Sequence, residues 1–287
     1  MSNNQRYYVP DGSHWPIIGA VGLLLTVVGV SSWLNGSNPA YWVFIAGLAV
    51  IVMMLIGWFH KVIGESVGGA YNDQVSLSFR MGMFWFIFSE VMFFSAFFSA
   101  LFYARNMSVP WLGGSSNNFF TNLLLWNGYE SSWPTNGPAN LGGDYQAMEP
   151  FGLPLINTVI LMSSSATVTV AHHALLKGNR GVLKLFLAAT FLLGFAFVYL
   201  QAHEYIHAYH ALNLKLTSGI YGSTFFMLTG FHGMHVTLGA IMLTIVWLRV
   251  IKGHFTPANH FAFEAAAWYW HFVDVVWICL YVFVYWL

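Results

Sequence analysis

Met81–Ala104 reads MGMFWFIFSEVMFFSAFFSALFYA, and Glu90 is its only charged side chain. The run is long enough to cross a bilayer hydrocarbon core of about 30 Å as a helix. A carboxylate in such a segment costs roughly 2.5–3.5 kcal/mol on insertion scales, so it usually faces protein or water and has a use. The run therefore predicts a membrane-spanning helix with a candidate functional residue inside it.

The overall composition fits the same class of protein. Of the 287 residues, 57% are apolar and 7% are charged, against roughly 25% charged in soluble domains. The formal net charge is zero, so no basic field suggests a nucleic-acid partner. The single cysteine, Cys279, excludes an internal disulfide framework and a cysteine-based metal site. The N-terminus lacks the charged-then-apolar pattern of a cleavable signal, so we expect the first apolar segment to be a retained span.

Seven apolar segments are each close to or longer than the roughly 20 residues that a spanning helix requires. They cover about Trp15–Leu34, Tyr41–Phe59, Met81–Ala104, Leu153–Leu175, Val182–Gln201, Gly222–Val250 and Phe263–Trp286. Their length and their lack of alternation exclude a β-barrel. We expect an all-α integral membrane protein with seven transmembrane helices. We also expect one membrane domain over residues 1–287.

The distribution of lysine and arginine predicts the orientation. With the N-terminus in the cytoplasm, the outer side holds two of these residues, Arg105 and Lys215. The inner side holds eight: Arg6, Lys61, Arg80, Lys177, Arg180, Lys184, Arg249 and Lys252. This positive-inside bias places the N-terminus inside and the C-terminus outside. The polar stretch 106–150 then forms a long outer loop, and its apolar patch Phe119–Trp126 is short enough for a surface helix.

Twelve histidines raise the question of a haem or metal site. No two predicted spans carry the matched histidine pairs that a two-haem membrane cytochrome needs, which weakens that function. His232 and His235 lie on one helix face at i and i+3, and we expect them to hydrogen-bond across helices or to Glu90. Three more histidines share a helix face near the end of the fifth segment: His203, His207 and His210. A zinc or copper ion at those three stays open as an alternative.

The last apolar segment holds two acids, Asp274 and Glu264. His271 and Asp274 stand at i and i+3, so we expect them to pair locally and to act as structural polar residues, as do His232 and His235. Glu264 would sit at the helix N-terminus, where the dipole favours an anion. For Glu90 three roles stay open. It could be a protonated carboxyl that hydrogen-bonds to a neighbour, a proton-handling group with a water path, or a group that fixes helix packing.

Basic side chains gather at the predicted inner ends of several helices: Arg80, Arg249, Lys252, His254 and His260, with Trp58 and Glu65 nearby. Basic side chains at the head-group level attract anionic lipids by about 1 kcal/mol each. We therefore expect phospholipid at these residues, beside their general part in setting the topology.

Dense, aromatic-rich motifs run from about the second span to the C-terminus. They are Phe88–Phe94 (FSEVMFF), Pro154–Thr158, Ala171–His173, Gln201–Tyr205, Ile220–Phe226, Thr229–Val236 and, most specifically, Phe263–Trp277 (FEAAAWYWHFVDVVW). Together they resemble subunit III of the haem–copper cytochrome c oxidases.

The resemblance implies a two-helix plus five-helix arrangement with a V-shaped cleft that holds phospholipid. It implies an accessory subunit without catalytic residues, haem or copper of its own. Oxygen reduction and proton pumping would belong to subunit I, which receives electrons through subunit II, and these partners would carry the haem and copper. Glu90 matches the family's buried carboxylate, which is tied to proton uptake. The complex could also join a larger respiratory assembly.

Gly64 and the pair Tyr71-Asn72 depart from the family pattern, in which many relatives carry an arginine and two histidines. Both changes remove candidate head-group ligands. The loop 106–150 is longer than in mitochondrial members, which favours a bacterial plasma membrane over the mitochondrial inner membrane. Seven spans favour the cytochrome c branch over the shorter quinol-oxidase versions. A stand-alone proton-coupled transporter or channel, with Glu90 and Asp274 as relays, is the alternative function, although no internal repeat supports it.

Overall fold

The computed structural model describes residues 8–9 and 12–287, and every regular element within them is helical. Seven of these helices are long and apolar enough to cross a membrane, which confirms the predicted all-α class with seven spans. Arg6, which contributed to the predicted orientation, lies outside the described residues.

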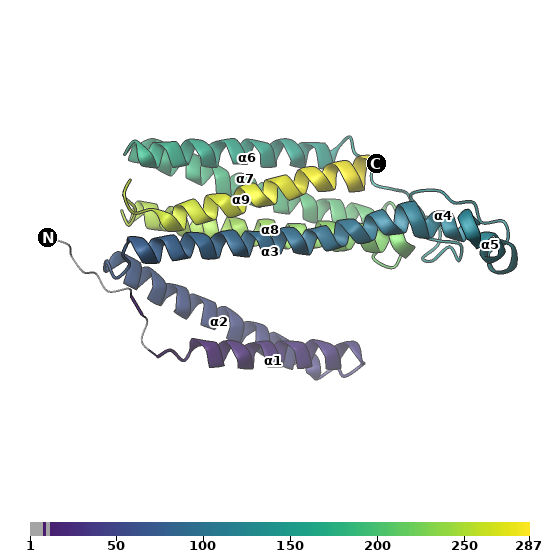
Figure 1. Ribbon diagram of the computed structural model, residues 1–287, viewed down its shortest axis with the longest axis horizontal. Helices are drawn as coiled ribbons and strands as arrows, with labels where there is room; N and C mark the ends of the chain where they lie inside the picture. The colour runs from purple at the N-terminus through teal and green to yellow at the C-terminus, as the bar shows by residue number, and fades with distance from the viewer. Residues whose placement is uncertain (1–7, 10–11) are drawn as a thin grey trace. The chain divides into compact units, whose positions relative to one another are not determined.

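The long helices extend beyond most of the expected segments. They are α1 (Trp15–Leu34), α2 (Ala40–Val67), α3 (Asp73–Tyr103), α6 (Leu153–Leu176), α7 (Arg180–His210), α8 (Gly219–Ile251) and α9 (Phe261–Leu280) (Figure 1). α3 continues through the π-helical turn η1 (Ala104–Ser108) into α4 (Val109–Leu112), and α9 continues into η3 (Tyr281–Trp286). The polar loop carries η2 (Ser116–Asn118) and the short helix α5 (Phe119–Leu125).

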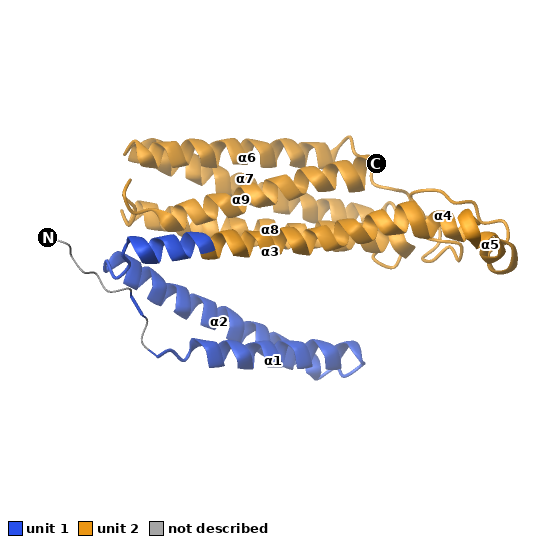
Figure 2. Cartoon of the chain, in the orientation of Figure 1, with its two compact units in different colours: residues 1–81 blue, residues 82–287 orange. Residues whose placement is uncertain are grey.

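The chain divides into two compact units, residues 1–81 and residues 82–287 (Figure 2). The first unit holds α1, α2 and the first turns of α3, and the second holds the rest of α3 with α4–α9. This division agrees with a two-helix plus five-helix arrangement. The single membrane domain and the lipid-holding cleft stay predictions.

α1 and α2 approach each other at glycines. A Cβ atom on Gly29 would collide with the backbone of Phe44, and one on Gly47 would collide with the backbone of Thr26. A Cβ on Gly22 would lie 2.9 Å from the Ile51 side chain. Helices in lipid gain stability from such close backbone contact, because lipid tails compete equally well for ordinary apolar side chains.

α9 is the most enclosed helix of the second unit. In an apolar 18-residue stretch of α9 and its continuation η3, 61% is buried, whereas in the corresponding stretch of α2 only 6% is. The fully buried Trp270 stands at its centre, and Gly194 of α7 and Gly239 of α8 leave the room that its indole occupies. Trp270 Nε1 donates to Ser164 Oγ of α6 at 2.9 Å. One aromatic side chain therefore ties α9 to three neighbouring helices.

The connection between α6 and α7 shows how local sequence sets helix ends. Gly178 has a positive φ of 71°, which favours glycine and lets the chain leave α6 sharply. The next residue, Asn179, caps α7 by accepting a hydrogen bond from the Val182 backbone N–H at 3.2 Å. The two helices consequently run antiparallel and in contact.

Candidate functional site

Glu90 of α3 and His235 of α8 meet inside the second unit. His235 Nε2 lies 2.9 Å from Glu90 Oε2, and His235 Nδ1 lies 2.6 Å from the Phe231 backbone oxygen. The His235 side chain is 6% exposed and that of Glu90 is 22% exposed, so part of the carboxyl reaches the helix surface. The centres of the Phe93 and Phe94 rings lie 6.0 and 5.1 Å from that of the imidazole. The acid and its histidine partner are thus enclosed largely by aromatic rings.

The Phe231 carbonyl fixes the tautomer of His235. A backbone carbonyl only accepts hydrogen bonds, so Nδ1 must carry a hydrogen and donate it. Nε2 then either accepts the proton of a neutral Glu90 carboxyl or, in an imidazolium, donates to the carboxylate. In both arrangements one proton lies between the two side chains and the pair has no net charge. A neutral pair avoids the high cost of an isolated charge in a low-dielectric surrounding.

His232 lies apart from Glu90, although it shares a helix face with His235. Its side chain is fully buried, and its Nε2 donates to the Val273 backbone oxygen of α9 at 3.2 Å. Its ring centre lies 5.6 Å from that of Phe197 and 5.1 Å from that of Trp277. These contacts give His232 a role in joining α8 to α7 and α9.

His271 and Asp274 lie close together on α9. His271 Nδ1 is 3.7 Å from Asp274 Oδ2 and 2.9 Å from the Ser165 hydroxyl of α6. The Asp274 side chain is 5% exposed and that of His271 is 42% exposed. His271 therefore lies beside the buried acid and hydrogen-bonds to α6. Glu264 occupies the first turn of the same helix, as its sequence position predicted.

Glu204 is a third buried acid of the second unit, and it is not among the residues predicted for the site. It is fully buried on α7, and its Oε1 accepts a hydrogen bond from the Tyr285 hydroxyl at 2.6 Å. Its Oε2 has no hydrogen-bond partner among the described residues. The expected fifth span ended at Gln201, whereas α7 runs on to His210, so the helix carries Glu204 into the core. The polar pair Gln201 and Glu204, at i and i+3, is the sequence signal that could have revealed it.

Two amides accompany Glu204 in a buried polar layer. Gln201 is 4% exposed and Asn157 of α6 is fully buried, and no side-chain oxygen or nitrogen of either has a partner in the described part of the chain. Thr167 Oγ1 lies 2.9 Å from Thr190 Oγ1. Because α6 and α7 are antiparallel, this contact places Asn157, ten residues before Thr167, level with residue 200 on α7. The two amides therefore lie at one level of the bundle.

Four of the seven predicted lipid ligands lie in the last turn of α8 and in its connection to α9: Arg249, Lys252, His254 and His260. The Arg249 guanidinium carbon lies 4.6 Å from the centre of the Phe255 ring. Arg180, from the start of α7, donates to the Phe255 backbone oxygen at 3.3 Å. The His260 ring centre lies 5.6 Å from that of His172. The structure thus adds Arg180 to the basic group that the sequence predicted.

The other three predicted ligands, Trp58, Glu65 and Arg80, belong to the first unit. Glu65 Oε1 lies 3.9 Å from Lys61 Nζ, and its Oε2 accepts a hydrogen bond from the Tyr71 hydroxyl at 2.7 Å. Burial and this hydrogen bond both raise the pKa of Tyr71 above the usual value of a phenol. Trp58 is 46% exposed beside Phe59. Tyr71 stands where the family pattern has a histidine, and its neutral hydroxyl donates a hydrogen bond to Glu65.

The three histidines of the alternative metal site lie on the exposed side of α7: His203, His207 and His210. Among residues 8–9 and 12–287, no group of three histidine, cysteine, aspartate or glutamate side chains is arranged to hold a metal ion. These observations define a class of protein: an integral membrane protein of seven spans whose buried acids and histidines bridge neighbouring helices.

Comparison with known proteins gives the family. The family model for cytochrome c oxidase subunit III matches residues 5–118 and 115–287. The cytochrome c oxidase subunit 3 of Coturnix japonica is 42% identical over 281 residues, which are 98% of this chain and 96% of the relative. The corresponding proteins of Squalus acanthias and Oryctolagus cuniculus are 41% and 39% identical over the same shares. The chain belongs to the cytochrome c oxidase subunit III family, and it is therefore a respiratory-chain protein of an oxidase complex.

Proposed function

We propose that this chain is the accessory subunit of a proton-pumping oxidase, in which it braces the catalytic subunit and supports proton uptake. The Glu90–His235 pair is the observation that carries the proposal. The pair holds one proton in a neutral arrangement, so that proton can pass between carboxyl and imidazole without a change in the net charge of the pair. The Glu90 side chain is 22% exposed at the surface of the second unit, where water or a partner protein would have to receive the proton.

The same proposal assigns partners and surroundings. Subunits I and II of the oxidase, with their haem and copper, would carry the redox reaction, and the complex could join a larger respiratory assembly. Phospholipid would bind at Arg249, Lys252, His254 and His260, and at the first-unit residues Trp58, Glu65 and Arg80. Arg180 supports this assignment, since it adds a second guanidinium beside Phe255. The chain would lie in a bacterial plasma membrane with its N-terminus in the cytoplasm.

Two substitutions of Glu90 separate a proton role from a packing role. In Glu90→Gln the amide N–H can still donate a hydrogen bond to His235 Nε2. The amide can no longer release or take up a proton as the carboxyl does. Glu90→Ala removes the hydrogen bond as well. We expect both variants to assemble and both to slow proton uptake or to shorten activity under turnover. Ser89→Ala is the matched control, because the Ser89 hydroxyl bonds only within its own helix, to the Phe86 oxygen at 2.7 Å.

The comparison of the variants decides the role of the pair. If Glu90→Gln behaves as the wild type while Glu90→Ala is impaired, the pair serves packing and the proton role is wrong. If neither variant differs from Ser89→Ala in pumping, steady-state rate and inactivation rate, Glu90 has no functional part.

The accessory role has its own test. A tag on this chain should retrieve a haem- and copper-containing catalytic subunit from a mild detergent extract. Removal of the chain should leave oxygen reduction in place while the remaining complex inactivates faster. Proton flux through liposomes that contain this chain alone, lost on Glu90→Gln, would instead support the transporter.

A further inference from the structure

Two fully buried tryptophans stand seven residues apart on α9, and their surroundings differ. At Trp270, three neighbouring helices each contribute one contact residue: Ser164 of α6, Gly194 of α7 and Gly239 of α8. The indole fills the space between the glycines, and its N–H is hydrogen-bonded. The level of Trp270 is therefore packed and has its polar groups paired, and it provides the reference for the level of Trp277.

Each of the three neighbouring helices carries a buried polar side chain seven residues from its contact with Trp270. Asn157 lies seven residues before the α6 contact, Gln201 seven residues after the α7 contact, and His232 seven residues before the α8 contact. Seven residues are nearly two helical turns, or about 10 Å, and return to almost the same helix face. Because α6 and α8 run antiparallel to α7 and α9, the three side chains all lie on the Trp277 side of Trp270.

Contacts of Trp277 agree with this register. Its Nε1 donates to Thr158 Oγ1 of α6 at 2.9 Å. Its ring centre lies 4.7 Å from that of Phe197 on α7 and 5.1 Å from that of His232 on α8. In α6 and α7 these contacts are one and four residues away from the two amides. His232 therefore extends the buried polar layer, in which four side chains from three helices converge beside Trp277.

The buried polar layer has hydrogen-bonding capacity that the protein does not use. Its members are at most 4% exposed: Asn157, Gln201, Glu204 and His232. Both polar atoms of each amide, Oε2 of Glu204 and Nδ1 of His232 have no partner among the residues that the structure describes. His232 Nε2 donates to the Val273 oxygen, which leaves Nδ1 of the neutral ring as an acceptor. Buried polar atoms are costly unless they are hydrogen-bonded, so these atoms point to a bound polar ligand.

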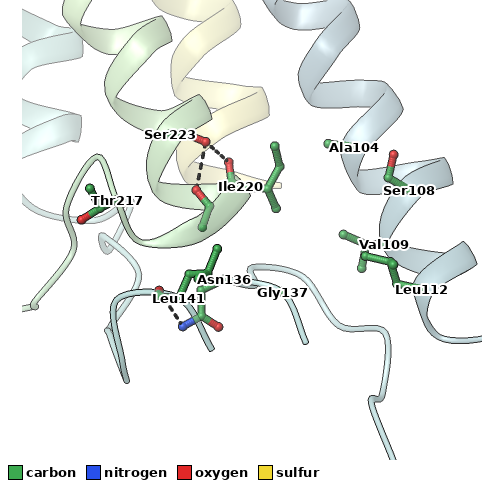
Figure 3. A pocket seen from close by; sticks show the side chains of 11 residues that line it. Ala104, Ser108, Val109, Leu112, Asn136, Gly137, Leu141, Thr217, Ile220 and Ser223 are labelled. Carbon is green, nitrogen blue, oxygen red and sulfur yellow. Dashed lines mark hydrogen bonds between the residues drawn. The ribbon is translucent and has the colours of Figure 1, made fainter. Parts of the chain in front are cut away.

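The larger cavity of the second unit differs in this respect. It has a volume of about 500 Å³ and lies between the end of α3, the start of α8 and loop residues 136–141 (Figure 3). Ser223 there donates to two backbone oxygens of its own helix, at 2.9 and 3.2 Å. The Asn136 amide donates to the Leu141 oxygen at 3.2 Å. These polar groups already bond within the protein, whereas those of the buried polar layer do not.

The unused groups of the layer require a ligand that both donates and accepts hydrogen bonds. The amide N–H groups of Asn157 and Gln201 need acceptors, and His232 Nδ1 needs a donor. Glu204 Oε2 needs a donor when the carboxyl is ionised and an acceptor when it carries a proton. A hard cation would serve only the oxygens and would leave the amide N–H groups unpaired. A buried water makes about three hydrogen bonds and can serve all of these groups.

We propose that the buried polar layer binds a cluster of water molecules, which bridge the amides of Asn157 and Gln201 to His232 Nδ1 and Glu204 Oε2. The level of Trp270 stays free of water, because its indole fills the space between two helices and is already bonded. This site goes beyond the accessory role, and it does not depend on a proton at Glu90.

X-ray radiolysis of the complete oxidase tests the proposal, because hydroxyl radicals that form from a buried water oxidise the side chains beside it. Oxidation at each tryptophan is read by fragmentation mass spectrometry. Both indoles are 0% exposed, so bulk solvent reaches neither. We expect Trp277 to be oxidised several-fold faster than Trp270. Equal rates at the two tryptophans would overturn the proposal and would leave the amides to pair with each other.

A double variant assigns the water to the amides. Asn157→Leu combined with Gln201→Met keeps the side chains close in size and removes their polar atoms, so it should abolish the difference between the two tryptophans. Asn106→Leu is the matched control, since that amide donates to the Phe102 oxygen of the helix that precedes it at 3.0 Å, and it should leave the difference unchanged. A difference that survives in the double variant would overturn the assignment. If the double variant does not assemble, the comparison of the two tryptophans in the wild type decides alone.

A change of salt separates water from an ion. Water in the layer predicts the same unfolding midpoint of the complete oxidase when choline replaces sodium and potassium. A midpoint that falls in choline for the wild type, and does not fall for the double variant, would assign the layer to a monovalent cation and would overturn the proposal.

Discussion

The α1–α2 pair and the helices of the second unit are joined by different contacts. Within the described part of the chain, no side-chain hydrogen bond links α1 to α2, and the hydroxyl of Thr26 bonds back to the Gly22 oxygen of its own helix at 2.8 Å. In the second unit, side chains bond across helices repeatedly: Glu90 with His235, Trp270 with Ser164, Trp277 with Thr158 and Glu204 with Tyr285.

The difference shows two ways of joining helices where the hydrophobic effect gives no preference for protein over lipid. Glycine contacts depend on shape alone, so they tolerate no added atom and carry no titratable group. Polar contacts depend on complete pairing, since an unpaired polar group in an apolar surrounding is costly. In the second unit, two acids, Glu90 and Glu204, each have a hydrogen-bond partner on another helical element.

The largest expected effect comes from closing the gap between α1 and α2. Gly29→Leu places a side chain against the Phe44 backbone, which cannot move aside as a flexible side chain can. We expect a loss of at least the roughly 1–3 kcal/mol typical of overpacked cores, seen as a lower midpoint of thermal unfolding in detergent. Gly64→Leu, in α2 with no atom within 4 Å of its Cβ, is the control. Equal midpoints for the two variants would show that the glycine contact does not hold the pair.

The second largest effect is expected at the hydrogen bond between Trp270 and Ser164. Ser164→Ala leaves the buried indole N–H without an acceptor, and we expect it to cost about 1–3 kcal/mol. Ser163→Ala removes a neighbouring hydroxyl that is exposed and bonds within its own helix to the Val159 oxygen at 2.7 Å. It should be nearly neutral in the same thermal unfolding measurement. If Ser164→Ala leaves the unfolding midpoint unchanged, the packing of the Trp270 indole against Gly194 and Gly239, and not its hydrogen bond, holds α9 in place.

Hydropathy was sufficient to predict the seven spans, because an apolar run of spanning length has few alternatives in a chain with 7% charged residues. It could not choose between His232 and His235 as the partner of Glu90. Residues three apart share a helix face, and only the packing of α8 between α3 and α9 turns one toward the acid and the other toward Val273.

Glu204 shows where hydropathy misleads. The stretch after Gln201 is rich in histidine and tyrosine, so its apolar signal ends while the helix continues to His210. Whether Glu204 is buried depends on Tyr285, which lies 81 residues later in the chain. Contacts of such separation leave no local pattern, and only the motif Gln201–Tyr205 pointed to this region.

The third prediction concerns that acid. Tyr285→Phe removes the hydrogen-bond donor to Glu204 Oε1 and leaves both oxygens of a fully buried carboxyl without a partner. We expect it to lower the unfolding midpoint, whereas Tyr285→Phe combined with Glu204→Leu should recover most of the loss, because the unpaired group is then gone. The coupling between the two positions should be about 0.6–1.7 kcal/mol, as for other hydrogen bonds between membrane helices. Strictly additive effects would show that Tyr285 does not support Glu204.

The smallest expected effect returns to the first unit, at Glu65, which lies outside the glycine contact. The Tyr71 hydroxyl donates to Glu65, and burial and this bond raise the pKa of Tyr71. A raised folded pKa favours the neutral phenol, so its stabilisation is complete below the ordinary value of about 10 and disappears as the pH rises through the folded value. Tyr71→Phe should therefore lower stability by the same amount at neutral and mildly alkaline pH, and by less above that range.

Phenolate absorbance provides the measurement. The absorbance lost in Tyr71→Phe should develop only above the ordinary phenol value of about 10. If it develops at that ordinary value, the Tyr71–Glu65 bond does not persist in solution. The close glycine contacts between α1 and α2 would then be the main stabilising contacts of the first unit, whereas hydrogen bonds between side chains join the helices of the second.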